Sequence, residues 1–518
     1  MEDAKQTALS WVDKNEQMLS DFHQQIWEYA EPAWREYKSV RAYCDLLNRE
    51  GFKVLEGTGG MPTAFMASYG EGTPVLGTFA EYDAVPGCSQ QAVPYKAPRD
   101  GFHKWTAGHT DPHSALGTGS LAGILAAKAA MDEHGLNGTL ALFGEPAEKV
   151  CGSKPVHAAK GYYNGFDALI VWHPQEVNSV CWETQSGAYW NAAFTFECET
   201  PETWLSQPQV ISGGRVPAAL DAVCLMYTTT KYTKEAMLPH TGLWTLNEAL
   251  LVGGQCTSDN IPPRISQITY AWRSPTLDIQ EQIYKVLVNN AEAVAKATWC
   301  KLTIDWVTKT RIGLFNQSVA ELTYRNLQLT GPPQYGEKAK GFAQEIQNSI
   351  KLDSMDDPFT TECQILMSPK EMETRLRTHL PPWQQNYSSD DYVEYTWHAP
   401  TARLYVARAV LAPAKSPYPM WTRLAMTGYR PTIDPMIFVA GKTLGTSFVE
   451  YLTSPSELKK AKDEFVERTG GGIGGSRWVS PLLSESFHPP IDLRWPDYVQ
   501  TDRGAEWWIP SSTVNNSP

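Results

Sequence analysis

The stretch Ser120–Ser153, SLAGILAAKAAMDEHGLNGTLALFGEPAEKVCGS, contains the pattern that decides the fold class. An Ala- and Leu-rich segment, residues 120–134, predicts a helix, and the apolar run GTLALFG, residues 138–144, predicts a buried strand. The strand leads directly into the polar turn EPAEKVCGS. A helix followed by a buried strand with polar residues at its C-terminal end is typical of α/β proteins, which place their chemistry at strand ends.

The same alternation extends to both sides of this stretch. The segments PTAFMASYG (62–70), TPVLGTFAEYD (73–83) and DALIVWHP (167–174) predict further strands, and residues 156–163 predict a short helix before the last of them. Two more helices are predicted between Thr7 and Glu50, where apolar residues recur at helical spacing. We therefore predict an α/β domain with a mainly parallel sheet covered by helices on both faces.

A second kind of pattern begins near Ser186. Strands are predicted at 188–198 and 265–274, and helices at 217–233 and 279–297. This β-α-β-α order predicts a small inserted domain of ferredoxin-like α+β type. The expected boundaries are 1–186 and 308–468 for the two parts of the main domain, 187–307 for the insertion, and 469–518 for a Trp- and Pro-rich C-terminal tail.

Composition limits the classes of partner. The 518 residues carry a formal net charge of −13, and Lys and Arg do not cluster, which argues against a nucleic-acid partner. No run approaches the roughly 18 apolar residues that cross a bilayer, and the polar N-terminus lacks the apolar core of a signal peptide. The nine cysteines are scattered and contain no CxxC pair, as expected for free thiols in a reducing compartment. We predict a cytoplasmic protein that acts on a small molecule, with no membrane or nucleic-acid partner.

Site-like residues are concentrated in four short segments that all follow predicted strands or lie in the loops after them. Each segment alone has an ordinary structural explanation, such as a capping Asp, a loop His, a charged turn or a strand-end Trp-His pair. Together they indicate a site, because one edge of a parallel sheet would gather them. The segments are AEYDAVPG (80–87), GHTDPHSALGTGS (108–120), GEPAEKVCGS (144–153) and VWHP (171–174).

These segments, with HQQIWEYAEPAWREYKS near the start and SSDDYVEYTWHAPTA near the end, resemble the zinc aminoacylase/carboxypeptidase clan of metallopeptidases. Within the clan they are similar to the aminobenzoyl-glutamate hydrolase branch (utilisation protein B). The resemblance covers nearly the whole chain. It implies a two-domain fold whose inserted domain serves as lid and dimerisation domain, a homodimer, and amide hydrolysis by two divalent ions, usually zinc or manganese.

The resemblance also implies a set of metal ligands, several of which are altered here. The family uses a Cys and a His of a GCGH turn, a Glu-Glu pair, a strand-end His and a late His, and the first Glu of the pair is the general base. On this chain the Cys becomes Asp111, the turn His is His113, the pair becomes Glu148-Lys149 and the strand-end His is His173. The late His should fall in SPYPMWTRLAMTG (416–428), which contains no histidine.

The lysine in place of a carboxylate has an electrostatic consequence. It exchanges a charge of −1 for +1 a few ångströms from two dications, which at an effective dielectric near 20 costs several kcal/mol per contact. A dinuclear site should not survive this change. Asp111, His113 and His173 could still hold one zinc or manganese ion, or Lys149 could pair with Asp111 so that no metal binds. We favour the metal-free alternative.

The remaining site predictions concern catalysis and substrate binding. The predicted acid-base groups are Glu148, His113, Asp83 and Lys149, and the predicted substrate-binding residues are Asn260, Arg273 and Trp172. Trp105 and Tyr82 are further candidates for the pocket lining, although core packing explains them equally well. The segment CETPETWLS (198–206), where the family has a histidine that reaches the partner subunit, contains none, and His240 and His398 are expected to make ordinary hydrogen bonds.

Three functions are compatible with this pattern. The first is an amidohydrolase-fold enzyme repurposed for metal-independent acid-base chemistry, such as amide or C–N bond formation, cyclisation or condensation in specialised metabolism. The second is a metal-dependent hydrolase of N-acyl amino acids or peptide-like amides. The third is a non-catalytic binding protein. We favour the first, because an enzyme without an activated water no longer destroys a condensation product.

Overall fold

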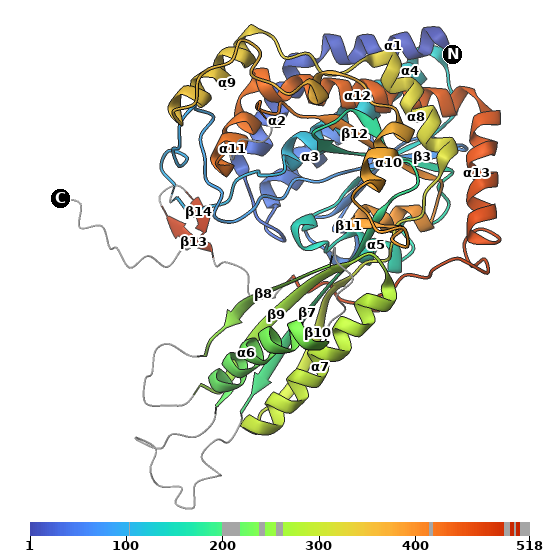
Figure 1. Ribbon diagram of the computed structural model, residues 1–518. Helices are drawn as coiled ribbons and strands as arrows, with labels where there is room; N and C mark the ends of the chain where they lie inside the picture. Colours follow the sequence, from blue (N-terminus) through green and yellow to red (C-terminus); the bar gives the residue numbers. More distant parts are fainter. Residues whose placement is uncertain are drawn as a thin grey trace, which may run out of the picture.

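The computed structural model describes residues 1–102, 104–198, 218–237, 244–254, 263–413, 418–491, 498–501 and 504–507. Asn260, His240 and nearly all of the segment 198–206 lie outside these residues, so the predictions made for them are not addressed. Figure 1 shows a large body in which helices surround a sheet, and a smaller elongated unit of strands and two helices that projects from it.

The sheet of the large body has seven strands in the order β1-β2-β4-β3-β5-β12-β6. Its central strands β4, β3, β5 and β12 run parallel to one another, while the strands toward each edge pair antiparallel. This arrangement confirms the predicted α/β fold with a mainly parallel sheet. The strands are β1 (Lys53–Glu56), β2 (Phe65–Glu71), β3 (Val75–Ala80), β4 (Gly138–Gly144), β5 (Ala168–Gln175), β6 (Ser179–Val180) and β12 (Thr401–Ala407).

Two long helices, α4 (His113–His134) and α12 (Arg430–Thr453), pack against each other and bring small residues into close contact. A Cβ atom added to Gly441 would lie 2.6 Å from the Cβ of Ala122, and one added to Gly123 would lie 2.5 Å from the Cβ of Leu444. Such close approach of two backbones requires glycine. The packing fixes α4 in the core with its first residue, His113, at the C-terminal end of the parallel strands.

Further helices cover the sheet, and three of them precede it where the sequence predicted two. The predicted helix at 120–134 also begins earlier, at His113, because the small residues after Pro112 continue it toward its N-terminus. The other helices of the large body are α1 (Glu2–Lys14), α2 (Glu16–Tyr29), α3 (Tyr37–Arg49), α5 (Lys154–Ala159), α8 (Gln317–Thr330), α9 (Glu337–Ser349), α10 (Pro369–Arg377), α11 (Met420–Gly428) and α13 (Pro455–Thr469).

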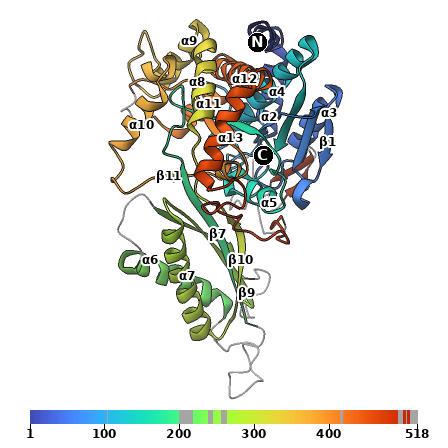
Figure 2. The same ribbon diagram turned by 90° about the vertical axis from the view of Figure 1, so that its right-hand side faces the viewer.

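The projecting unit has the order β7-α6-β8-β9-α7-β10, and its strands form an antiparallel sheet in the order β10-β7-β9-β8. This is the ferredoxin-like βαββαβ topology. The sequence pattern predicted two of these four long strands and did not predict β8 or β10. The elements are β7 (Ser186–Glu197), α6 (Ala219–Met237), β8 (Thr245–Val252), β9 (Ile265–Ser274), α7 (Leu277–Thr298) and β10 (Lys301–Lys309), and the short strand β11 (Tyr387–Ser389) joins β7 in parallel. Figure 2 shows α6 and α7 on one face of this sheet.

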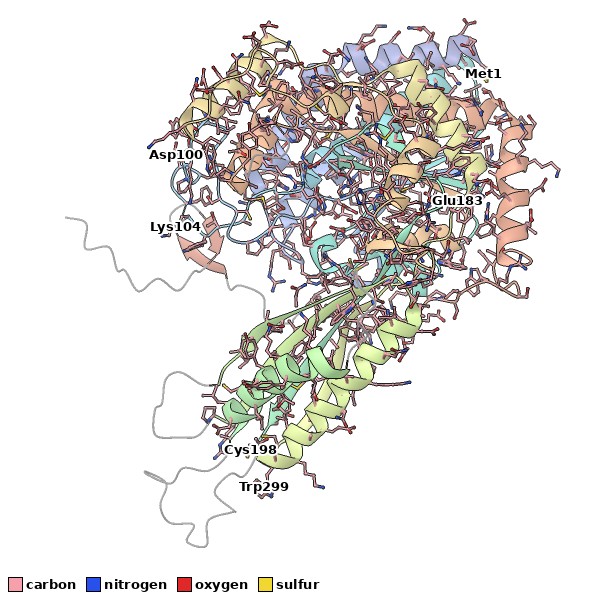
Figure 3. The ribbon with its side chains drawn as sticks, in the orientation of Figure 1. Met1, Asp100, Lys104, Glu183, Cys198 and Trp299 are labelled. Atoms are coloured by element: carbon pink, nitrogen blue, oxygen red, sulfur yellow. The ribbon has the colours of Figure 1, made fainter. Side chains whose placement is uncertain are left out.

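The projecting unit has its own aromatic core and is joined to the large body near the ends of its strands. Trp190, Trp272 and Trp306 pack together with ring centroids 5.6–6.1 Å apart. Figure 3 shows Cys198 and Trp299 at the end of the unit that is far from the large body. At the near end, the hydroxyl of Thr308 donates a hydrogen bond of 2.6 Å to the carbonyl of Cys151. In the described part of the chain, every helix is too short or too polar to cross a membrane.

Candidate functional site

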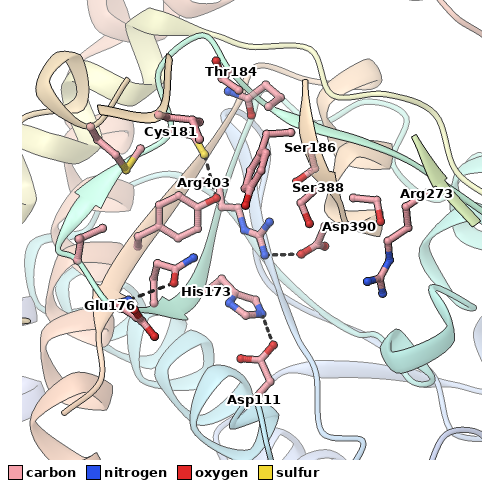
Figure 4. Close-up of a pocket in the computed structure, with 18 of the residues that line it drawn as sticks. Asp111, His173, Glu176, Cys181, Thr184, Ser186, Arg273, Ser388, Asp390 and Arg403 are labelled. Carbon is pink, nitrogen blue, oxygen red and sulfur yellow. Dashed lines mark hydrogen bonds and ion pairs between the residues drawn. The ribbon is translucent and has the colours of Figure 1, made fainter. Parts of the chain in front are cut away.

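A cavity of about 760 Å³ opens where the large body meets the projecting unit. The large body contributes side chains from the strand ends and loops, and β9 contributes Arg273. Figure 4 shows the His173 ring directed toward Asp111, and the Arg403 guanidinium directed toward Asp390. The cavity therefore combines both parts of the fold, with paired charges on its wall.

The site residues reach this cavity because they follow the parallel strands. Glu81 and Asp83 come after β3, the loop that contains Glu148 comes after β4, and His173 lies near the end of β5. The carboxyl ends of parallel strands meet at one edge of a sheet. The structure thus brings together the four segments that the sequence singled out, with His113 at the start of α4 among them.

The loop after β4 has a strained backbone that directs Glu148 and Lys149 toward the cavity. Ala147 and Cys151, on either side of the short 3₁₀ helix Glu148–Val150, have φ values of 56° and 50°, in the left-handed region. Two carboxylates hold the loop: the N–H of Ala147 donates to Glu36 at 2.8 Å, and the N–H of Lys149 donates to Asp83 at 2.8 Å. Backbone strain that is held in place by neighbouring groups is typical of functional sites.

His113 connects Asp83 to the side chain of Lys149. Its Nδ1 lies 2.6 Å from Asp83 Oδ1, and its Nε2 lies 2.7 Å from Lys149 Nζ. An ammonium group donates hydrogen bonds and cannot accept them. Nε2 therefore accepts from Lys149, and Nδ1 donates to Asp83. Nε2 also lies 3.1 Å from Glu81 Oε2 and 3.2 Å from Glu148 Oε2.

Lys149 carries a permanent charge in this position. Burial alone would lower the pKa of its ammonium, but the carboxylates of Asp111, Glu148, Asp83 and Glu81 outweigh burial and raise the pKa above its ordinary value. Nζ lies 3.7 Å from Asp111 Oδ2 and 3.5 Å from Glu148 Oε2. The ammonium thus occupies the centre of the group formed by His113 and these carboxylates.

Asp111 is surrounded by positively charged or ring-nitrogen partners. Its Oδ2 lies 3.3 Å from His173 Nε2, and its Oδ1 lies 3.5 Å from Arg423 Nη2. Burial would raise the pKa of Asp111, but His173 and Lys149 outweigh it and hold the pKa well below its usual range. Asp111 is therefore ionised and its charge is already compensated by protein groups.

The residues around His113 fit a divalent ion only if the Lys149 side chain moves. A zinc ion bound to His113 Nε2 would lie about 2 Å from that nitrogen, in the space that Lys149 Nζ fills at 2.7 Å. Among the described residues, three groups bring possible ligand atoms within 4.8 Å of one another. These groups are Glu81, His113 and His173; Asp83, His113 and Glu148; and Glu148, Cys151 and Asp391. The first two share His113, so a single ion there would require Lys149 to move.

A second buried cation lies behind the site. Lys154 Nζ donates hydrogen bonds of 2.6 Å to both Glu81 Oε1 and Asp391 Oδ1, and all three side chains are almost completely buried. Burial raises the pKa of Glu81 and of Asp391 well above the usual range, although Lys154 opposes the change. The sequence analysis did not identify Lys154 or Asp391, because no spacing rule connects residues so far apart in the chain.

The prediction that Trp172 contacts the substrate is wrong. Its side chain is fully buried, its indole N–H donates to the carbonyl of Leu116 at 2.9 Å, and it packs against Gly119 of α4. Successive side chains of a strand point to opposite faces of the sheet. Because His173 points into the cavity, Trp172 points into the core.

The other aromatic candidates also lie outside the cavity lining. Tyr82 is fully buried and donates a hydrogen bond to the carbonyl of Thr63 at 2.5 Å, and Trp105 is exposed on the surface. Arg273 lines the cavity, and its contact with a substrate stays a prediction. His398 makes an ordinary hydrogen bond of 2.9 Å to Asn164.

Arg423 is a site residue that the sequence analysis missed. It lies on α11, within the segment 416–428 where the family resemblance predicts a histidine ligand, and its guanidinium lies 3.5 Å from Asp111. The signal in the sequence that could have identified Arg423 is its positive charge. A cationic residue in a segment expected to lie near the acidic Asp111 indicates an ion pair, even where the segment contains no metal ligand.

No family model matches the chain. The chain is 25% identical over 468 residues to one of the subunits of p-aminobenzoyl-glutamate hydrolase of Escherichia coli (strain K12), and the match covers 88% of this chain and 94% of that protein. It is 22% identical over 313 residues to Xaa-Arg dipeptidase of Mus musculus, with 58% and 65% of the two chains covered.

A solved structure supports the same fold. The aminobenzoyl-glutamate utilization protein from Klebsiella pneumoniae superposes with a TM-score of 0.51 at 12% identity, over 84% of this chain and 98% of that one. These comparisons confirm the resemblance to the aminobenzoyl-glutamate branch of this clan. The two relatives similar in sequence are named as a hydrolase and a dipeptidase.

Proposed function

We propose that this protein is an amidohydrolase-fold enzyme that acts on an amide or related C–N bond of a small molecule without a resident pair of metal ions. The observation that carries the proposal is the position of the Lys149 ammonium, 2.7 Å from His113 Nε2 and 3.5 Å from Glu148 Oε2. It supplies one fixed positive charge where a hydrolase of this fold would bind divalent ions.

Glu148 and Lys149 have the properties that acyl transfer requires. Glu148 lines the cavity, its side chain is only 11% exposed, and as a general base it would accept a proton from the attacking nucleophile. The Lys149 ammonium would stabilise the negative charge that develops on the substrate carbonyl oxygen. His113, held by Asp83, fixes the position of that ammonium. Arg273, which lines the same cavity, is the proposed contact for an anionic group of the substrate.

The nucleophile decides between hydrolysis and bond formation. Metal ions in hydrolases generate hydroxide at neutral pH by lowering the pKa of bound water. Without them, water loses this advantage over an amine, which is intrinsically more nucleophilic. We therefore propose transfer of the acyl group from the substrate amide to an acceptor amine as the favoured reaction. The acceptor nitrogen attacks the carbonyl carbon and gives a proton to Glu148, the original C–N bond breaks, and Glu148 returns the proton to the departing amine.

A metal-dependent hydrolase is the second candidate. It is supported by the ligand group Glu81, His113 and His173 and by the names of the relatives. It requires Lys149 to leave its contact with His113. The two candidates differ in metal content and in sensitivity to chelators, which makes them separable by experiment.

The test begins with protein purified without added metal, whose zinc and manganese content is measured by elemental analysis. Turnover of p-aminobenzoyl-glutamate and a panel of N-acyl amino acids is then followed with and without an acceptor amine and with and without 1,10-phenanthroline. We expect less than about 0.2 metal equivalents per chain as an order-of-magnitude bound, turnover insensitive to the chelator, and loss of turnover in Glu148→Gln. Glu183→Gln, an exposed carboxylate on the surface, is the matched control and should retain activity.

Chelator-sensitive turnover with one or two bound ions would contradict the proposal and favour the second candidate. Turnover that survives in Glu148→Gln would remove Glu148 as the base. Absence of turnover with every substrate and acceptor in the panel would favour a non-catalytic binding protein.

The homodimer implied by the resemblance stays a prediction. β8 pairs only with β9 among the described strands and forms one edge of the second sheet, which is where strand pairing between two copies would occur. Light scattering of the purified protein would give the mass of the assembly directly.

A further inference from the structure

Asp111 lies between nitrogen-bearing side chains that come from different parts of the fold. Lys149, from the loop after β4, and His173, from β5, lie near its Oδ2, while Arg423, from α11, lies near its Oδ1. The Nε of Arg423 is buried and has no hydrogen-bond partner among the described residues. The guanidinium is therefore directed at Asp111, and its Nε makes no other hydrogen bond in the described structure that would hold it in a different position.

A neighbouring arginine, Arg408, limits the ion pairs that Arg423 can form. Arg408 forms an ion pair with Glu176 of the cavity wall. Burial, followed by the positive charge of Arg423, lowers the pKa of Arg408 to about 10. Arg423 thus has a like charge on one side and Asp111 on the other, and Asp111 is the carboxylate with which it forms an ion pair in the described structure.

Two side-chain cations face Asp111 without any divalent ion. Lys149 Nζ lies 3.7 Å from Asp111 Oδ2, and Arg423 Nη2 lies 3.5 Å from Asp111 Oδ1. Arginine does not lose its proton in proteins, and the pKa of Lys149 is raised. The two side-chain cations therefore compensate the negative charge of Asp111. In a site with more negative ligands, two divalent ions would compensate that charge.

We infer that Arg423 is a positioning residue that, with Lys149, takes the place of the two divalent ions around Asp111. Arg423 holds one carboxylate oxygen of Asp111, and the other oxygen faces the Lys149 ammonium and keeps it against His113. This inference rests on the proposed metal-free site. It adds a residue, Arg423, and a role that concerns the geometry and charge of the site rather than the reaction itself.

The experiment uses Zn²⁺ alone as the probe, so that it does not depend on knowing the substrate. Lys149→Glu provides a background in which an ion can bind, and each second substitution is made in that background. The informative double variant combines Lys149→Glu with Arg423→Met, and the matched control combines Lys149→Glu with Arg375→Met. Arg375 is 54% exposed on α10 and pairs only with Glu371 in the described structure. Zinc affinity is measured by competition with a chelating dye on full-length protein.

We expect the Arg423→Met double variant to bind Zn²⁺ at least about tenfold more tightly than the control double variant, because one positive charge near the ion has been removed. Arg423→Lys in the same background should restore the weaker affinity of the control. Equal zinc affinity in the Met and control double variants, including no binding in either, would overturn the inference. If Arg423→Met fails to fold, as judged by circular dichroism, Arg423→Gln replaces it with the same expected outcome.

A second readout separates this inference from the proposed function. In a crystal structure of the single variant Arg423→Met, we expect Asp111 to turn away and the contact between Lys149 and His113 to lengthen beyond hydrogen-bond distance. An unchanged contact would contradict the positioning role. The proposed function is tested independently by the metal content of the wild-type protein, which can fail while the effect of Arg423 holds.

Discussion

Replacing Lys149 should convert the site into one that binds divalent ions. Its ammonium lies 3.7 Å from Asp111 Oδ2 and 2.7 Å from His113 Nε2, in the space of an ion bound to His113. An ion can bind there only if the ammonium moves aside, and a separation of roughly 4 Å between the two is taken for the displaced side chain. Repulsion between a dication and one charge at that distance is about 2 kcal/mol in the dielectric of bulk water and about 8 kcal/mol at an effective dielectric near 20. The Lys149 side chain is 19% exposed, which places the true value between these limits.

The lower limit already gives large effects on affinity. Lys149→Met removes the repulsion, and Zn²⁺ should bind at least roughly 30-fold more tightly than to the wild type. Lys149→Glu replaces repulsion by attraction of similar size, so the gain should be at least roughly 1000-fold. Arg375→Met, which removes an exposed charge that pairs with Glu371, should leave the affinity unchanged.

Metal-stripped proteins would be titrated with Zn²⁺ in the presence of a dye of known zinc affinity, and the bound metal counted by elemental analysis. The ordering Glu above Met above wild type is the expected result. If Lys149→Glu binds zinc no better than the wild type, the charge of Lys149 does not control ion binding. If the wild type already binds two ions tightly, the ammonium does not occupy the metal position in solution.

Two further predictions concern stability. Burial would raise the pKa of Glu145, but His157 and the other partners of Glu145 outweigh burial and hold the pKa at about 2. The stability that the ionised carboxylate contributes is therefore present above about pH 4.5 and is lost as the pH falls toward 2. Urea unfolding should show the wild type losing roughly 3 kcal/mol more than Glu145→Gln across that range, whereas parallel losses would contradict the role of Glu145. Gly441→Ala should destabilise the protein by about 1–3 kcal/mol because the new methyl group meets Ala122. Gly341→Ala, in an open helical position of α9, should stabilise the protein by roughly 0.5–1 kcal/mol. Equal shifts in the thermal midpoints of the two variants would refute the packing argument.

The linear pattern of the sequence determined most of the fold. The strands at 138–144 and 265–274 lie where the structure has β4 and β9, because short apolar runs bounded by turn residues leave little choice of element. Elements with weak local signals were missed or misplaced, notably β8, a strand with exposed residues, and the part of α4 from His113 to residue 119. Their formation depends on pairing with β9 and on packing against α12, which the local sequence does not express.

The sequence also determined which charged residues gather at the sheet edge, since strand order places the segments after β3, β4 and β5 side by side. It predicted that Lys149 would stand close to Asp111, and the two lie 3.7 Å apart. Only the tertiary structure decided that Trp172 faces the core and that Arg423 faces Asp111. The reason is physical. Packing across the whole fold fixes which face of a strand is buried and which distant helix supplies a counter-charge. Neither outcome leaves a periodic or short-range pattern in the sequence.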